Sequence, residues 1–141
     1  MADKSPLFTA RIPVRWGDMD SRQHVNNAVY IRYMEEARIL WFNSIGVARG
    51  AVGPLVLQNM HTYLKAVEHP ATVRLDLYAG AIGRSSLVLE HRLTTEEDPK
   101  TLYGEGFCKL VWVNYESNQS IPVPEAMREL FLRHGGIAKR A

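Results

Sequence analysis

The segment from about Asn27 to Ile45 constrains the fold more than any other part of this 141-residue chain. It is typical of one long helix, because Asn26 or Asn27 can cap its start and Gly46 follows its end. Ten of the sixteen residues from 30 to 45 are apolar. Such a wide apolar surface predicts a helix that is buried on more than one side. Several strands wrapped around one helix are the simplest way to bury it.

The rest of the chain supplies those strands. Alternating apolar residues from Ala10 to Trp16 predict a first strand, and Pro13 within it favours an edge position or a bulge. Four further strands are predicted at Leu55–Lys65, Thr72–Ala79, Ser85–Leu93 and Tyr103–Asn114. A short C-terminal helix is predicted at about Glu125–Arg133. The breaks between the four strands are short, which favours antiparallel hairpins over crossovers.

This order of elements predicts an α+β domain over residues 1–141, with an antiparallel sheet curled around one central helix. The length and the 46% apolar and 23% charged composition are typical of one globular domain. The net charge of +2 and the lack of a basic run among aromatics argue against a nucleic-acid partner. One cysteine, no leader-like apolar stretch and no membrane-length apolar run lead us to expect a cytoplasmic protein without a membrane partner.

A carboxylate and an imidazole, Asp20 and His24, lie just before the predicted helix. A helix start offers unpaired backbone N–H groups and the positive end of the peptide dipoles, so it can hold an oxyanion. A carboxylate beside it can attack a bound carbonyl carbon or activate water. The alternative is structural, because aspartate often caps a turn and a loop histidine often only makes hydrogen bonds.

Other chemistries lack support in the sequence. The chain has no Gly-x-Ser-x-Gly elbow, no phosphate loop and no dinucleotide fingerprint. Cys108 lies in mid-strand and is expected to be a packed small residue. The five histidines never fall at metal-ligand spacing. We therefore expect no metal and no redox cofactor.

The opening of the chain carries a motif made of Val14-Arg15-Trp16-Gly17-Asp18-Met19-Asp20, His24-Val25-Asn26-Asn27, Tyr30 and Glu35-Glu36-Ala37-Arg38. This motif resembles the opening of the hotdog-fold acyl-CoA thioesterases, above all the 4-hydroxybenzoyl-CoA thioesterase-like and long-chain acyl-CoA thioesterase branches. Residues 23–27 are similar to the plant acyl-carrier-protein thioesterases. A looser likeness continues through residues 83–87 and 121–125. The resemblance implies a hotdog fold, hydrolysis of an acyl-CoA thioester, and a homodimer or homotetramer with sites at the subunit interface.

The resemblance also implies roles for individual residues. Asp20 would be nucleophile or general base, His24 would contact the thioester carbonyl or protonate the leaving thiolate, and the main-chain N–H near Asn27 would hold the oxyanion. Substrate contacts would come from Arg22, Asn26 and Tyr30, and from the turn Gly83, Arg84, Ser85 and Ser86, which is similar to the coenzyme A-binding edge of the family. Coenzyme A would then be part of the substrate and not a retained cofactor.

Two features complicate these assignments. At Gln23, bacterial relatives commonly carry a glycine, and the neighbouring Arg22 could instead contact coenzyme A phosphates. Some hotdog branches place their catalytic carboxylate on the central helix, where Glu35 and Glu36 lie. The Arg32–Glu36 and Glu35–Arg38 spacings offer a plainer explanation for both as ion pairs.

Two rival functions belong to other classes. A non-catalytic hotdog module would bind acyl-CoA or an acyl carrier protein, but the joint presence of Asp20, His24 and Asn27 argues against it. A hotdog enoyl-thioester hydratase would typically have Asp and His five residues apart with an Asn-Pro between them. Here Asp20 and His24 are four apart without a proline.

Overall fold

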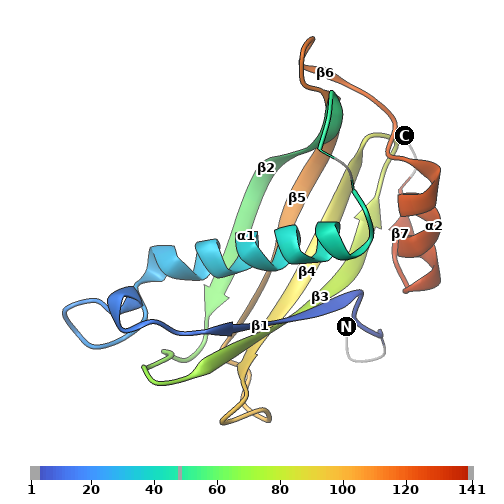
Figure 1. Cartoon of the computed structure of the whole chain (residues 1–141). Helices are drawn as coiled ribbons and strands as arrows, with labels where there is room; N and C mark the ends of the chain where they lie inside the picture. The colour runs from blue at the N-terminus through green and yellow to red at the C-terminus, as the bar shows by residue number, and fades with distance from the viewer. Residues whose placement is uncertain (1–3, 48, 140–141) are drawn as a thin grey trace.

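The computed structural model describes residues 4–47 and 49–139 (Figure 1). Along the chain the elements are β1 (Phe8–Pro13), the 3-10 helix η1 (Trp16–Asp18), α1 (Asn27–Ser44), β2 (Val52–Tyr63), β3 (Thr72–Ile82), β4 (Ser86–Thr95), β5 (Gly104–Asn114), β6 (Gln119–Ser120), α2 (Glu125–Arg133) and β7 (Ile137–Ala138). The long helix, strands β2 to β5 and the C-terminal helix form close to where the sequence predicts them, whereas β1 begins and ends earlier than predicted. No helix in these two ranges is long and apolar enough to cross a membrane.

The main strands form one curled sheet in the order β1-β3-β4-β5-β2, and all their pairings are antiparallel. Figure 1 shows α1 crossing one face of this sheet, while α2 lies beside β7 at the far end. The predicted α+β class, with a curled antiparallel sheet around a central helix, is confirmed. Pro13 ends β1, which is an edge strand, so the expectation drawn from this proline also holds.

One predicted hairpin is wrong. The short break around residues 68–70 joins β2 to β3, but these strands are not neighbours in the sheet. β2 is one edge strand, and β3 lies next to the other edge strand, β1. Both edges of β3 are occupied, one by β1 and the other by β4, so β2 pairs with β5 instead. A short loop therefore carries the chain across the sheet, and it passes the start of α1, where Val25 N–H donates to the carbonyl oxygen of Val67 at 2.9 Å.

Burial of α1 also differs from the prediction. Within this chain the helix is buried along one face, through Tyr30, Tyr33, Met34, Ala37, Arg38, Trp41 and Phe42. On its other side Ile39 is 48% exposed and Leu40 is 40% exposed. One sheet covers only one face of a helix, so the second apolar face remains uncovered in a single chain.

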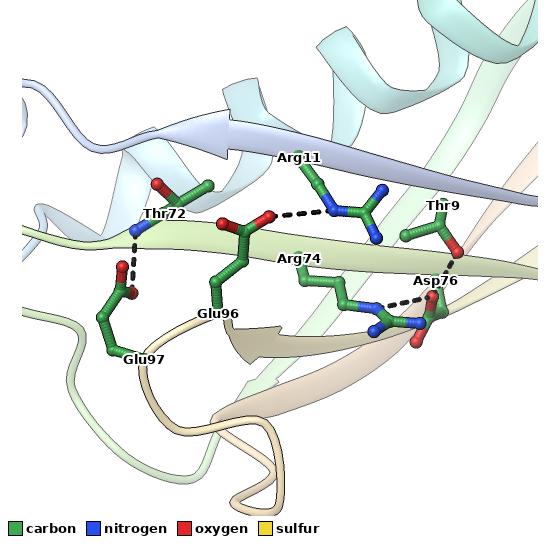
Figure 2. A network of polar contacts seen from close by, with 7 residues as sticks. All are labelled: Thr9, Arg11, Thr72, Arg74, Asp76, Glu96 and Glu97. Atoms are coloured by element: carbon green, nitrogen blue, oxygen red, sulfur yellow. Dashed lines mark hydrogen bonds and ion pairs between the residues drawn. The ribbon is translucent and has the colours of Figure 1, made fainter.

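The outer face of the sheet is polar (Figure 2). Arg11 Nε lies 2.9 Å from a carboxylate oxygen of Glu96, and Thr9 donates a hydrogen bond to Asp76 across β1 and β3. The core therefore lies on the opposite face, between the sheet and α1.

Trp16 departs from the predicted first strand. The strand ends at Pro13, and Trp16 begins η1 with its side chain 80% exposed. After Val14 the apolar alternation no longer predicts which side chains are buried, because the chain leaves the sheet there. The indole that was expected on the apolar face is thus on the surface.

Candidate active site

The loop before α1 is closed by its own hydrogen bonds. Asp20 N–H donates to the carbonyl oxygen of His24 at 2.8 Å, and Gln23 N–H donates to that of Asp20 at 3.0 Å. The Asp20 carboxylate oxygen Oδ1 accepts from the N–H groups of Arg22 at 2.8 Å and His24 at 3.4 Å. The turn-capping role of Asp20 is therefore real. Both of these bonds end at the same oxygen, Oδ1, and not at Oδ2.

The start of α1 provides a free donor. Asn26 is the cap, because its Oδ1 accepts from Ala28 N–H at 2.9 Å. Val29 N–H donates to the carbonyl oxygen of Asn26. The N–H of Asn27 donates to no other group in the described part of the chain. This N–H lies at the positive end of the helix dipole and is the group that the resemblance implied as oxyanion donor.

Four predicted site residues line one pocket of about 460 Å³ at the helix start: Asp20, His24, Asn27 and Tyr30. The rest of its lining comes from Val25 and from the end of β2 and the loop after it: Tyr63, Leu64, Lys65 and Ala66. The His24 side chain is 45% exposed, and its Nε2 lies 3.5 Å from Glu68 Oε1. The imidazole therefore lies at the solvent-exposed edge of the pocket.

Tyr63 lines the same pocket, although no motif of the sequence singles it out. Its hydroxyl donates to the carbonyl oxygen of Asn27 at 2.7 Å, which ties the end of β2 to the first turn of α1. Its ring meets that of Tyr30 edge to face, with centroids 5.1 Å apart. The 36-residue separation of Tyr63 from Asn27 hides this contact from any local sequence pattern.

Tyr30 makes a structural contact through its hydroxyl. The side chain is buried, and its hydroxyl accepts a hydrogen bond from Val67 N–H at 3.0 Å. Burial raises the pKa of Tyr30, and the Val67 hydrogen bond partly offsets that shift. The hydroxyl therefore holds the crossing loop in place, while the ring forms the pocket wall.

Asp18 ties the loop to α1 from the other side. Its Oδ2 accepts from Tyr33 Oη at 2.6 Å and from Arg15 N–H at 2.9 Å. Burial, followed by the hydrogen bond to the Asp18 carboxylate, raises the pKa of Tyr33 far above its usual range. Tyr33 therefore stays a neutral hydrogen-bond donor, and the role of Asp18 is structural.

Two predicted groups of substrate contacts lie elsewhere. Arg22 is exposed and lines a second pocket, which shares Asp20 with the first. The turn 83–86 follows β3, whereas the Asp20 loop lies near the first residue of this strand, as the bond from Val14 N–H to the Ala71 carbonyl shows. The two sites therefore lie at opposite ends of β3, whose 11 residues span about 33 Å when extended.

The predicted ion pairs of α1 are not formed among the described residues. Arg38 is buried, and its Nη1 has no hydrogen-bond partner there. Its positive charge lowers the pKa of His91 on β4 and acts in the same direction on Cys108 of β5. Glu35 and Arg38 also line a pocket of about 420 Å³ between α1 and β2.

Beneath the site lies a pair of histidines, of which His61 is half-buried and His91 is buried. His61 Nδ1 is 2.8 Å from His91 Nε2, and the His61 ring stacks on Tyr30 with centroids 5.4 Å apart. The His61 ring lies directly over Gly104 of β5. Burial lowers the pKa of His61 to about 4, and burial with the charges of His61 and Arg38 lowers the pKa of His91 to about 3. Both imidazoles are therefore neutral at physiological pH.

Cys108 is buried, as predicted, and burial raises the pKa of its thiol. Within residues 4–47 and 49–139, no group of three or more His, Cys, Asp or Glu side chains is placed to hold a metal ion.

Comparison with known proteins extends these observations. PA2801 from Pseudomonas aeruginosa, provisionally assigned as a thioesterase, is 61% identical with a TM-score of 0.85, over 89% of this chain and 98% of that one. A provisionally assigned acyl-CoA thioesterase from Xanthomonas campestris is 34% identical with a TM-score of 0.74, over 84% and 100% of the two chains. A thioesterase from Thermus thermophilus, solved with coenzyme A and Zn, is 33% identical with a TM-score of 0.76, over 92% and 95%.

The sequence profile of the thioesterase-like superfamily matches residues 14–131. The matched range contains the loop, the whole of α1 and every long strand of the sheet except β1. The chain therefore belongs to the thioesterase-like superfamily and is a thioester hydrolase by family, as the resemblance of its opening motif predicted.

Proposed function

We propose that this protein hydrolyses an acyl-CoA thioester to the free acid and coenzyme A at the start of α1. One observation carries the proposal: the Asp20 carboxylate and Asn27, whose N–H is unpaired in the described chain, line the same pocket. The thioester carbonyl would accept from Asn27 N–H, and a donor of this kind stabilises an oxyanion by about 2.7–4 kcal/mol.

Asp20 has two routes to the reaction. As general base it takes a proton from water, the hydroxide adds to the carbonyl carbon, and collapse of the oxyanion expels the coenzyme A thiolate, which is then protonated. As nucleophile its carboxylate displaces the thiolate to give a mixed anhydride, which water then hydrolyses. The two loop N–H groups on Oδ1 orient the carboxylate, and either route can use Oδ2, which accepts neither of these bonds. His24, at the pocket edge, can protonate the leaving thiolate.

Coenzyme A enters as part of the substrate and not as a retained cofactor. The Thermus thioesterase complexed with coenzyme A supports this assignment, because it covers almost the full length of this chain at 33% identity. Arg22 would contact the phosphates.

A second copy of the chain would complete the site. β2 is an edge strand whose exposed residues include Leu55, Val56, Leu57 and Met60, and α1 has an uncovered apolar side. Pairing of two β2 edges would bury both surfaces and give a homodimer. Dimerisation would also bring a turn of residues 83–86 from one copy toward the site of the other, which one chain does not do.

The test is thiol release from short, medium, long and aromatic acyl-CoAs by the wild type and Asp20→Asn. Asparagine keeps an acceptor for the two loop N–H groups but cannot attack or take a proton. We expect kcat to fall about 100-fold or more, with little change in melting temperature. Glu116→Gln, on an exposed turn, is the matched control.

Glu35→Gln tests the alternative catalytic carboxylate, on α1, in the same assay. Full activity of Asp20→Asn together with an inactive Glu35→Gln would move the catalytic carboxylate onto α1 and contradict the proposed mechanism. A folded wild type that releases thiol from no thioester would contradict hydrolysis itself and favour a binding module.

A further inference from the structure

Trp16 is the most exposed large apolar side chain described, at 80%. Burial of an aromatic side chain is among the larger favourable contributions to folding, so an exposed indole gives up that stabilisation. The other two tryptophans behave in the usual way: Trp41 is 0% exposed and Trp112 is 3% exposed. Trp16 therefore needs an explanation outside the core of its own chain.

The backbone under Trp16 is held firmly. Met19 N–H donates to the Trp16 carbonyl oxygen at 3.2 Å, and Asp18 N–H donates to that of Arg15 at 2.9 Å. The Asp18 carboxylate in turn accepts from the buried Tyr33 of α1. The indole thus projects from a segment that is tied to the central helix, so a ligand that stacks on it need not order the backbone first.

Trp16 forms one wall of a pocket of about 590 Å³, which is lined by Trp16, Gly17, Met19, Asp20, Arg22, Gln23, Glu68 and His69. Most of these side chains are polar. The exposed apolar residues of β2 line other surfaces, so this pocket lacks the apolar character of the edge where a second copy would pair. Asp20 lines both this pocket and the one at the start of α1, so the two pockets are neighbours that share this residue.

We propose that the Trp16 pocket binds the adenine of coenzyme A, an inference that rests on the proposed acyl-CoA substrate. A flat indole suits the face of a purine, and base stacking on an aromatic side chain is a common mode of nucleotide recognition. A glutamine amide can pair with the N6 and N7 edge of adenine, and a carboxylate can accept from the N6 amino group. Gln23 and Glu68 supply these two groups.

The charges of the pocket fit a neutral base better than a phosphate. Asp20 and Glu68 together carry two negative charges, against one positive charge on Arg22. Arg22 is exposed at the rim, where it can pair with the phosphates that lie outside the base pocket. The flexible pantetheine arm joins the nucleotide to the thioester and can curve around the Asp20 loop from one pocket to the other.

Tryptophan fluorescence tests the contact without any need for turnover. Because Trp41 and Trp112 are buried, the solvent-exposed part of the emission comes from Trp16. We expect coenzyme A and 3′-phosphoadenosine 5′-phosphate to quench this emission and shift it to the blue, and pantetheine to leave it unaltered. Trp16→Phe should remove the response.

Calorimetric titration with the same two nucleotides measures the affinity. Trp16→Ala should weaken binding about 5- to 100-fold, and Trp16→Phe should weaken it less because a smaller ring remains. Leu132→Ala, at an exposed position of α2, is the matched control and should bind like the wild type.

Two results would overturn the proposal. One is equal affinity of Trp16→Ala and wild type for 3′-phosphoadenosine 5′-phosphate. The other is a tryptophan emission that changes when the protein is diluted but does not change when nucleotide is added, which would mean that a second copy covers Trp16. Quenching by nucleotide without release of thiol from any acyl-CoA would support the adenine site while contradicting hydrolysis, so the two proposals fail separately.

Discussion

Gln23 adopts a strained backbone conformation that shapes the loop of the site. Its φ of 63° lies in the left-handed region, which favours glycine. The conformation lets the chain turn so that the N–H groups of Arg22 and His24 both reach Asp20.

Substitutions at Gln23 should separate this strain from side-chain contacts. Gln23→Gly relieves the left-handed strain, so we expect the melting temperature to stay or to rise slightly. Gln23→Val places a β-branched side chain in that region and should cost about 1–2 kcal/mol. Thermal and urea unfolding of both variants checks which one is more stable, and equal stability of the two would contradict a strained backbone.

At the scale of elements, local patterns predict what local contacts determine. The 3.6-residue periodicity and the asparagine cap locate α1, and period-two alternation locates β3, β4 and β5. Strand order depends on pairings between distant segments, so local patterns alone predict a hairpin where β2 in fact crosses to β3. The same limit applies to the site: Asp20 and Asn27 belong to one local motif that predicts both, whereas Tyr63 reaches Asn27 from another element.

The layer between α1 and the sheet should make stability depend on pH. Unfolded histidines titrate near 6.5, while His61 and His91 stay neutral in the fold down to about 4 and about 3. Between pH 6.5 and 4 the unfolded chain binds more protons, so stability falls as the pH falls through this window. Each unit of lowered pKa corresponds to about 1.4 kcal/mol at most.

Urea unfolding at pH 7.5, 6.5, 5.5 and 4.5 measures that slope. The double variant His61→Phe with His91→Leu should have a flatter dependence than the wild type. If the variant does not fold, the imidazole proton resonances of the wild type provide the check. Titration of either buried ring with a midpoint near 6.5 would contradict the assignment.

At the scale of the whole molecule, the uncovered apolar surface is the main feature that one chain leaves unexplained. We expect the protein to be a dimer by light scattering and sedimentation. Leu57 is 56% exposed on β2, and Leu57→Asp would bury an unpaired carboxylate in the paired edges. A cost of about 3 kcal/mol would weaken association roughly 100-fold. Leu132→Asp on α2 is the control, and a wild-type monomer would contradict the interface.

The position of the His61 ring over β5 has an evolutionary consequence. A side chain at Gly104 would overlap the imidazole, and at Gly106 it would collide with the main-chain oxygen of Met60. Gly106 is thus restricted by backbone, whatever residue occupies position 61. Gly104 is restricted mainly by the ring, together with the Thr62 carbonyl. Lineages that keep a histidine at 61 should keep a glycine at 104, and those that lose the ring are the ones in which position 104 can begin to vary.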